Sequence, residues 1–386
     1  MLPFAQRSHE LEVGAMPAAR PMRYRAAPLV GCRNLLQCGS WWQPLPRCRE
    51  PKAFARIGAS VEIICASLTL RNRAEITATV DTLQLGHSGI EIAPLGVGAM
   101  SWANRSLMSY GGADSPQEEA RALEECLAAG VTLVDTAEAY GRGRSERRVG
   151  ELARAHREVI VATKYAPYPF RRASSLPEAL DRSLQRLGRI DLYQLHWPPR
   201  FVTIPSLLRL FAAARADGRI GAVGVSNFDA AQLRAAHAEL ARADVPLASN
   251  QVQYSLLHRA PERDGVLETC RELGVTLIAY SPLAMGALTG KYGPGRRPRG
   301  IRRVLPQFRA RRMSALEGVL RVLTEIAERH QAGPPSVALR WLIEQGAVPL
   351  PGAKNGQQAA TTAGALRLTL ERAEIDALSA ATLTWQ

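Results

Sequence analysis

Several features that would assign a chain to a familiar functional class are missing from this sequence. No apolar run reaches the 18 or more residues that a membrane-spanning helix needs, so no membrane span is expected. The six cysteines contain no Cys-x-x-Cys pair, which leaves no sign of a zinc ribbon or a thioredoxin-type motif and favours a reducing compartment. The seven histidines are scattered along the chain, so no metal centre is predicted.

Signatures of common enzyme classes are missing as well. No Gly-x-Ser-x-Gly elbow is present, which argues against a serine hydrolase of the α/β type. The stretch "LGVGAMSWAN" does not fit the Gly-x-Gly-x-x-Gly fingerprint of an open dinucleotide-binding sheet. Asp135 and Glu138 lie in one short segment, and two carboxylates placed so do not obviously flank a sugar for glycoside cleavage.

Acidic residues are scarce at the amino end. Residues 1–79 hold 11 Lys and Arg against 5 Glu and no Asp, which gives this segment +6 of the net +14. An Arg-rich, acid-poor leader is typical of organelle import signals, so residues 1–79 are predicted to be a disordered extension that acts as a transit peptide. A plain disordered tail or an overextended reading frame is the alternative. The predicted location is the plastid, with mitochondrial or cytoplasmic placement as alternatives.

The positive charge has a second interpretation, which is binding to nucleic acid. Aromatic and basic residues do not interleave along one face of any segment, so no nucleic-acid partner is expected.

Residues 80–386 show a regular alternation of strand and helix patterns. "LQLGHSGIEIAPL" reads as a hairpin around a Gly-His-Ser-Gly turn. Eight short apolar runs follow, at 95–98, 131–135, 159–164, 191–196, 221–226, 249–254, 275–281 and 347–352. Helical patterns separate them, several with Ser, Asp or Pro at the start and Gly at the end. This order predicts one (β/α)8 TIM barrel, with a doubly wound open sheet as the alternative.

Polar residues follow nearly every apolar run. In a barrel of this kind the chemistry lies at the carboxyl ends of the strands, where these side chains would meet. They are Asp135, Tyr140, Lys164, His196, Trp197, Ser226, Asn227, Gln251, Tyr280, Ser281, Gly352 and Lys354.

Four of these residues form a candidate catalytic group. Asp135 and Lys164 at neighbouring strand ends would pair, because neither charge is buried cheaply alone. A cation beside Tyr140 favours the phenolate and lowers the pKa of the phenol, which could then exchange a proton with a carbonyl oxygen. His196 could donate a hydrogen bond and orient the substrate. Each of the four residues alone has a structural explanation. Because they occur together, in strand order, a catalytic role is favoured.

Seven sequence blocks, in order, resemble those of the aldo-keto reductase family. They are "VDTAEAYG", "VIVATKY", "IDLYQLHWP", "VGVSNF", "NQVQYSLL", "IAYSPLAMGALTGKY" and "PGAKNGQQ". The resemblance runs from about residue 82 to 383 and is strongest to the plant and cyanobacterial-type plastid group, which is pyridoxal reductase-like. More remotely, the chain is similar to the potassium-channel β subunits.

The resemblance implies a barrel that binds NADPH without a separate dinucleotide domain. It implies Tyr140 as general acid, Lys164 and Asp135 as the groups that tune it, and His196 as the group that orients the carbonyl. Ser226, Asn227 and Gln251 would hold the nicotinamide carboxamide, and Tyr280 would stack on the ring. The loop after it would cover the pyrophosphate, through Ser281, Pro282, Leu283, Gly286 and Lys291, with Gly290 allowing close backbone approach.

The segment after the eighth strand would hold the adenosine end, through Gly352, Lys354 and Gln358. Lys354 near the ribose favours a 2′-phosphate, hence NADPH over NADH. The chain has Thr361 and Thr362 where the family usually has Glu and Asn, so reduced coenzyme affinity is expected.

The expected partner is a small-molecule carbonyl substrate, reduced to an alcohol. Trp102, Phe170 and Trp197 are predicted to line the substrate pocket, with packing within loops as their structural alternative. Pyridoxal is one specific substrate option. A nucleotide-sensing regulatory subunit, like the channel β subunits, is the alternative function. The sequence leaves the oligomeric state open.

Overall fold

The computed structural model describes residues 81–102, 116–167, 171–293, 295–298 and 300–385. The predicted extension 1–79 therefore lies outside the described residues. A short antiparallel hairpin, β1 (Leu83–Gln84) and β2 (Glu91–Ile92), precedes eight parallel strands. The eight are β3 (Val97–Gly98), β4 (Leu133–Asp135), β5 (Ile160–Tyr165), β6 (Leu192–Leu195), β7 (Ala222–Ser226), β8 (Leu247–Gln253), β9 (Thr276–Tyr280) and β10 (Ala347–Leu350).

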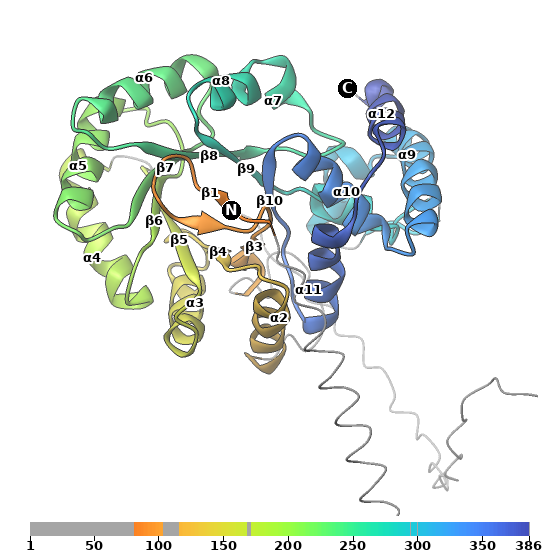
Figure 1. The fold of residues 1–386 in the computed structure, drawn as a ribbon, viewed down its shortest axis with the longest axis horizontal. Coiled ribbons are helices and arrows are strands. Elements are labelled where there is room, and N and C mark those ends of the chain that lie inside the picture. Colours follow the sequence, from red (N-terminus) through yellow and green to blue (C-terminus); the bar gives the residue numbers. More distant parts are fainter. Residues whose placement is uncertain (1–80, 103–115, 168–170, 294, 299, 386) are drawn as a thin grey trace, which may run out of the picture. The chain divides into compact units, whose positions relative to one another are not determined.

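The eight strands form a barrel in sequence order. Each strand from β3 to β10 pairs in parallel with the next, and the first and last strands meet through backbone hydrogen bonds. Gly96 N donates to Pro349 O at 3.1 Å and Gly98 N donates to Pro351 O at 3.0 Å. Figure 1 shows the strands as a ring with the helices outside it. The predicted (β/α)8 barrel and its amino-terminal hairpin are confirmed, and the open sheet is excluded.

The interior of the barrel is apolar at its amino end. Inward-facing residues of the strands form one buried cluster with two residues of the hairpin region, Leu85 and Ile92. Gly86 N donates to Thr276 Oγ1 at 2.8 Å, which fixes the hairpin to β9. The hairpin therefore closes this end of the barrel, across which it is drawn in Figure 1. Any ligand must enter from the other end.

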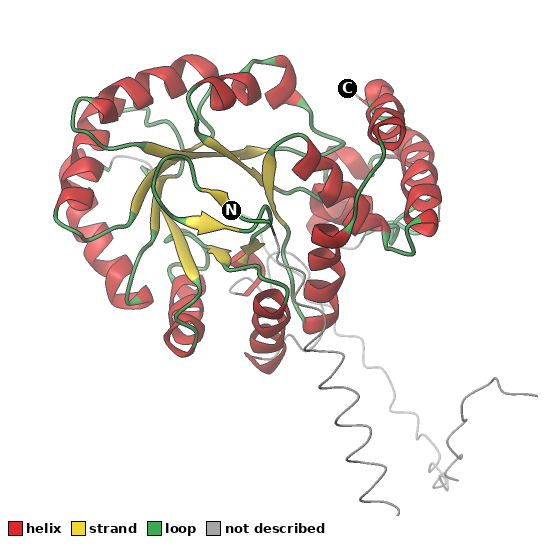
Figure 2. Cartoon of the chain, viewed as in Figure 1, coloured by secondary structure: helices red, strands yellow, loops and turns green. Residues whose placement is uncertain are grey.

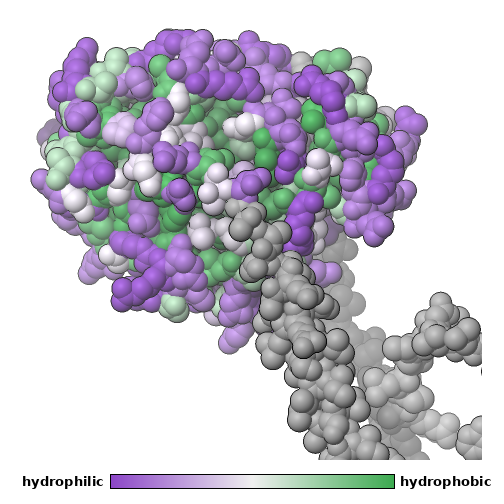
Figure 3. Space-filling view, viewed as in Figure 1, coloured by the Kyte–Doolittle hydropathy of each residue, from purple (hydrophilic) through white to green (hydrophobic). Residues whose placement is uncertain are grey.

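Amphipathic helices cover the outside of the barrel (Figure 2). They are α2 (Pro116–Ala128), α3 (Arg144–Ala155), α4 (Leu176–Leu187), α5 (Ile204–Ala216), α6 (Ala230–Ala241), α7 (Ala260–Arg263), α8 (Val266–Glu272), α9 (Ala310–Arg329), α10 (Pro334–Glu344), α11 (Gly356–Ala363) and α12 (Arg372–Ala381). Their outer faces are mostly hydrophilic in Figure 3, because the apolar side faces the strands. Among the described helices, none is both long and apolar enough to cross a bilayer.

Two details of the helices differ from the sequence expectation. The pattern "PERDGVLETCRELG" reads as one helix, but the structure divides it into α7 and α8. Gly265 between them has φ +77°, a left-handed conformation that interrupts helical hydrogen bonding. Helices α11 and α12 follow the last strand, where the sequence analysis gave no helix bounds.

The contact between α3 and α4 depends on Gly150. A Cβ on Gly150 would lie 2.1 Å from Arg186 O and 2.9 Å from Leu187 Cα, both of which are backbone atoms. The Gly150→Ala variant should therefore be destabilised by about 2 kcal/mol, since overpacking against backbone outweighs the gain in helix propensity. Urea denaturation would measure this change.

The matched control is Gly318→Ala, in the interior of α9. Gly318 is exposed, and a Cβ there would meet nothing within 4 Å. This variant should gain up to about 1 kcal/mol from helix propensity alone. Equal changes in the free energy of unfolding of the two variants would show that helix propensity, and not the α3–α4 contact, determines the effect of Gly150→Ala.

Candidate active site

On β4, β5 and β6 the apolar interior gives way to polar side chains two residues further along the strand, and on β7 to a glycine. Leu133, Ala162, Leu192 and Ala222 belong to the buried interior cluster. Because side chains alternate along a strand, the residues two positions later face the same interior. These are Asp135, Lys164, Gln194 and Gly224. The polar layer therefore lies at the carboxyl ends of the strands, as predicted.

Asp135 and Lys164 form a buried ion pair within this layer. The Lys164 Nζ donates to Asp135 Oδ2 at 2.5 Å and to Thr136 O at 2.9 Å. Lys164 has no exposed surface and Asp135 is 4% exposed. Burial acts to lower the pKa of Lys164, but Asp135 and Tyr140 beside it carry the pKa above its ordinary value. Lys164 is therefore a cation at neutral pH.

Tyr140 lies against this pair. It follows β4 in the turn that leads to α3, and Lys164 Nζ is 5.2 Å from the centroid of its ring. Burial raises the pKa of the phenol above its ordinary value of 10.0, Lys164 opposes the rise, and Asp135 adds to it. The expectation of a lowered pKa for Tyr140 is wrong, because desolvation outweighs the nearby cation. The phenol is protonated at neutral pH.

His196 completes the group of four. Its ring lies edge-on to Tyr140 with centroids 5.9 Å apart, and it stacks on Trp197 with centroids 3.4 Å apart. Burial, followed by repulsion from Lys164, lowers the pKa of His196 to about 2, so the ring is neutral. Its Nδ1 is buried without a hydrogen-bond partner among the described residues. A bare acceptor is less costly than a bare donor, which places the ring proton on Nε2.

A chain of hydrogen bonds joins the ends of β6 to β9. Ser226 Oγ donates to Gln251 O at 2.7 Å, and Asn227 Nδ2 donates to His196 O at 3.0 Å. Tyr280 OH donates to Asn227 Oδ1 at 3.0 Å. Asn227 has φ +61°, a strained conformation for a residue other than glycine and one often found at functional sites. The structure thus brings these predicted coenzyme residues together beside His196.

Gln194 belongs to the site but is missing from the sequence prediction. Its Nε2 donates to Asp135 Oδ1 at 3.2 Å, and Gln251 Nε2 donates to the same oxygen at 2.9 Å. Gln251, expected to hold a carboxamide, therefore also contacts the ion pair. One sequence signal could have found Gln194: it precedes His196 by two residues on a strand and must face the same side.

Comparison with known proteins agrees with the barrel fold and with the resemblance found in the sequence. The model of the Aldo/keto reductase family matches residues 94–382. The chain belongs to the aldo/keto reductase family. It is therefore an oxidoreductase of the class that reduces carbonyl compounds, which confirms the predictions of family and general activity.

Two curated relatives of this aldo/keto reductase span most of its barrel. The chloroplastic pyridoxal reductase of Arabidopsis thaliana is 37% identical over 298 residues, which are 72% of this chain and 80% of that protein. The NADH-specific methylglyoxal reductase of Escherichia coli is 30% identical over 318 residues, which are 76% of this chain and 95% of that protein.

A solved structure agrees with the fold of this aldo/keto reductase. The glycerol dehydrogenase of Gluconobacter oxydans superimposes with a TM-score of 0.69 at 26% identity. The match covers 78% of this chain and 95% of the dehydrogenase.

The loop after β9, expected to cover a pyrophosphate, is strained in this aldo/keto reductase. Its glycines have left-handed backbone, with φ +95° at Gly286 and +72° at Gly290. Ser281, Ala284 and Met285 also have positive φ. Of the other predicted contacts, Pro282 is buried, Leu283 is half-buried and Lys291 is exposed. Such strain at non-glycine residues clusters at ligand sites.

The segment after β10 has well-defined hydrogen bonds. Lys354 N donates to Gln358 Oε1 at 3.2 Å, and Gln358 N donates to Asn355 Oδ1 at 2.9 Å, which caps α11. Gly352 is exposed. Thr361 Oγ1 donates to Gln357 O and Thr362 Oγ1 to Gln358 O, so both threonine hydroxyls bond within their own helix.

The predicted substrate-binding residues are found in different settings. Trp197 is half-buried and stacked on His196, at the carboxyl end of β6. Trp102 is buried, and its Nε1 donates to Ala353 O at 2.7 Å, which ties the segment after β3 to the segment after β10. Phe170 lies outside the described residues.

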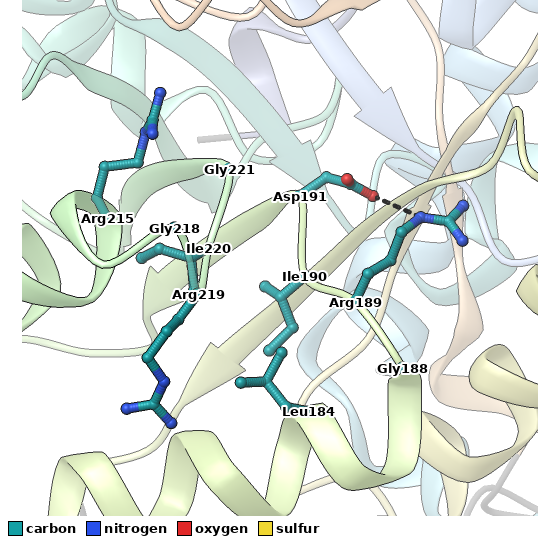
Figure 4. Close-up of a pocket in the computed structure, with 10 residues that line it drawn as sticks. All are labelled: Leu184, Gly188, Arg189, Ile190, Asp191, Arg215, Gly218, Arg219, Ile220 and Gly221. Atoms are coloured by element: carbon teal, nitrogen blue, oxygen red, sulfur yellow. Dashed lines mark ion pairs between the residues drawn. The ribbon is translucent and has the colours of Figure 1, made fainter.

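Other sites are not supported among the described residues. No group of three or more His, Cys, Asp or Glu could hold a metal ion within those ranges. A surface hollow lies at the amino ends of β6 and β7, opposite the polar layer, and its Arg189 pairs with Asp191 at 3.5 Å (Figure 4). The side chains of Arg215 and Arg219 point in different directions there, and Arg219 pairs with Asp181.

Proposed function

We propose that this chain is an NADPH-dependent reductase of a small aldehyde or ketone, with Tyr140 as the proton donor. The observation that carries the proposal is the set of contacts around Tyr140. A protonated phenol lies beside the buried Lys164–Asp135 pair and the edge of a neutral imidazole, His196, all at the open end of the barrel.

The proposed chemistry follows from these contacts. A dinucleotide held here would supply a hydride for the carbonyl carbon. Tyr140 donates its proton to the carbonyl oxygen as negative charge develops there. His196, neutral and protonated on Nε2, donates a hydrogen bond that orients the same oxygen. Lys164 stabilises the tyrosinate that remains, and Asp135 holds Lys164 in place.

The described residues fit a dinucleotide along this end of the barrel. Asn227 and Ser281 have positive φ, and Tyr280 OH donates to Asn227 Oδ1, which supports a site for a flat ring beside Tyr280. The turn after β10 carries Lys354, with its backbone fixed by Gln358. We assign the carboxamide to Ser226, Asn227 and Gln251, and the phosphate end to Lys354.

The choice of NADPH over NADH depends on Lys354. A lysine that pairs with the 2′-phosphate contributes only to NADPH binding, because NADH has a hydroxyl at that position. The Lys354→Ala variant should raise the KM for NADPH about tenfold and leave the KM for NADH unchanged. Steady-state kinetics with both coenzymes would measure this.

Lys291→Ala is the matched control for that experiment. Lys291 is exposed on the loop assigned to the pyrophosphate, which both coenzymes share. Its removal should weaken NADPH and NADH alike. If Lys354→Ala also weakens both equally, the assignment of Lys354 to the 2′-phosphate is wrong. Both coenzymes must be compared, because one relative, the Escherichia coli methylglyoxal reductase, is named as NADH-specific.

The first test of the function is oxidation of NADPH at 340 nm by the full chain. The aldehydes offered would be pyridoxal, methylglyoxal and 4-nitrobenzaldehyde. Turnover supports the reductase, and preference for pyridoxal would support the activity named for the Arabidopsis relative. Tight NADPH binding without turnover would instead support a nucleotide-sensing subunit.

We further propose that residues 1–79 are a plastid transit peptide followed by the barrel domain at 80–386. The support is the excess of arginine over acids in this segment and the chloroplastic name of one relative. Import of the full chain into isolated chloroplasts, with loss of the leader on a gel, would test this. Import into mitochondria alone would contradict it.

A further inference from the structure

Gln194 lies at the centre of the polar layer. In the sheet register it pairs with Lys164 on one side and with Gly224 on the other. Its side chain is fully buried. A Cβ on Gly224 would lie 2.9 Å from Gln194 Cγ and 2.4 Å from Ser249 Oγ. The missing side chain at Gly224 therefore leaves the room in which the Gln194 amide extends across β7.

The Gln194 amide has hydrogen-bond partners at both its nitrogen and its oxygen in this space. Its Nε2 donates to Asp135 Oδ1 at 3.2 Å. Its Oε1 accepts from Gln251 Nε2 at 3.4 Å and from Ser249 Oγ at 3.5 Å. Because a carboxylate only accepts hydrogen bonds, the amide must present its nitrogen to Asp135.

The two oxygens of Asp135 consequently have different partners. Oδ2 accepts from Lys164, whereas Oδ1 accepts from the amides of Gln194 and Gln251. A buried carboxylate with one free oxygen could turn about its Cβ–Cγ bond and leave the lysine. Two amide donors on Oδ1 prevent that turn.

We propose that Gln194 is a positioning residue for proton transfer, which holds Asp135 so that its Oδ2 faces Lys164 and Lys164 faces Tyr140. This inference rests on the proposed function, because it assigns Gln194 a part in the chemistry of Tyr140. Gln194 itself touches Asp135, Ser249 and Gln251 and acts through them. Gln251 links the same carboxylate to the carboxamide site.

The test compares Gln194→Met with Tyr193→Phe in the full chain. Methionine keeps the length of glutamine but removes the oxygen and the nitrogen of its amide. Tyr193 precedes Gln194 on β6, is fully buried, and its hydroxyl has no hydrogen-bond partner among the described residues. Tyr193→Phe therefore removes a buried polar group from the same strand without touching the network.

We expect Gln194→Met to lower kcat by about tenfold or more, with the KM for aldehyde and the Kd for NADPH unchanged. The alkaline limb of the kcat–pH profile should move to higher pH. Asp135, no longer offset by the Gln194 amide, disfavours the tyrosinate more strongly, and a displaced Lys164 favours it less. Among the described residues, the charged and titratable groups that face Tyr140 are Asp135, Lys164 and His196.

A crystal structure of Gln194→Met supplies a readout independent of activity. The expected result is a longer contact between Asp135 Oδ2 and Lys164 Nζ, because the Gln251 amide alone then holds Asp135 Oδ1. The inference is overturned if that contact is intact and the kcat–pH profile matches Tyr193→Phe, or if NADPH binding weakens while kcat is unchanged. If Gln194→Met does not fold, Gln194→Asn, which withdraws the amide by one methylene, replaces it.

Failure of the proposed function gives a different pattern. A wild-type chain that turns over none of the aldehydes contradicts the reductase. The geometry of Asp135 in the variant crystal still decides whether Gln194 positions it.

Discussion

The Tyr140→Phe variant should lose about three orders of magnitude in kcat for aldehyde reduction while it binds NADPH as the wild type does. A positioned general acid contributes typically about 10²- to 10⁴-fold, and no other protonated group at this end of the described barrel lies against Lys164 as the Tyr140 ring does. Phenylalanine keeps the ring and its contact with His196. The measurement is kcat at 340 nm together with fluorescence titration of NADPH.

Tyr193→Phe is the control for this variant as well. Burial raises the pKa of both phenols, but only Tyr140 lies beside Lys164. The control should keep wild-type kcat. A Tyr140→Phe variant with more than about a tenth of wild-type kcat would contradict the assignment of Tyr140 as general acid.

The direction of the Tyr140 pKa also fixes a pH dependence. Reduction needs the protonated phenol, and burial raises its pKa above 10.0 in the free protein. The titration of Tyr140 should therefore leave kcat/KM constant from pH 6 to 9. The value of kcat/KM should fall only above that range, where the phenol loses its proton. His196 adds no limb there, since its pKa of about 2 leaves it neutral throughout.

The Lys164→Met variant should be destabilised by about 3–5 kcal/mol as well as inactive. Its removal leaves the Asp135 carboxylate buried without a cation, and breaking one side of a buried ion pair costs about that much. Chemical denaturation measures the stability, and NADPH oxidation measures the activity.

The double variant Asp135→Asn with Lys164→Met separates the two losses. Asparagine keeps an acceptor oxygen for the two glutamine amides but carries no charge, so most of the stability should return. Activity should not return, since no cation then faces Tyr140. If Lys164→Met is as stable as the wild type, the removal of Lys164 does not leave an uncompensated charge on Asp135. That result would contradict the proposed energetics of the buried ion pair.

The sequence alone determined the barrel and the positions of its reactive groups. Apolar runs such as 131–135 and 159–164 are local patterns, and each ends in a residue, Asp135 or Lys164, that must lie where the strand ends. Strand order in a parallel barrel then places those ends at one rim, so Tyr140 and His196 follow without any coordinates. The family blocks are equally local, because they depend on residue identity and spacing.

Only the tertiary structure decided how those groups affect one another. The pKa of Tyr140 depends on burial by several elements, and that desolvation reversed the direction expected from Lys164 alone. The spacing of Gln194 from His196 places it on the interior face, but its hydrogen bond to Asp135 depends on the room that Gly224 leaves on the next strand. Hydrogen-bond partners and solvent exposure are set by residues far apart in the chain, so no local pattern records them.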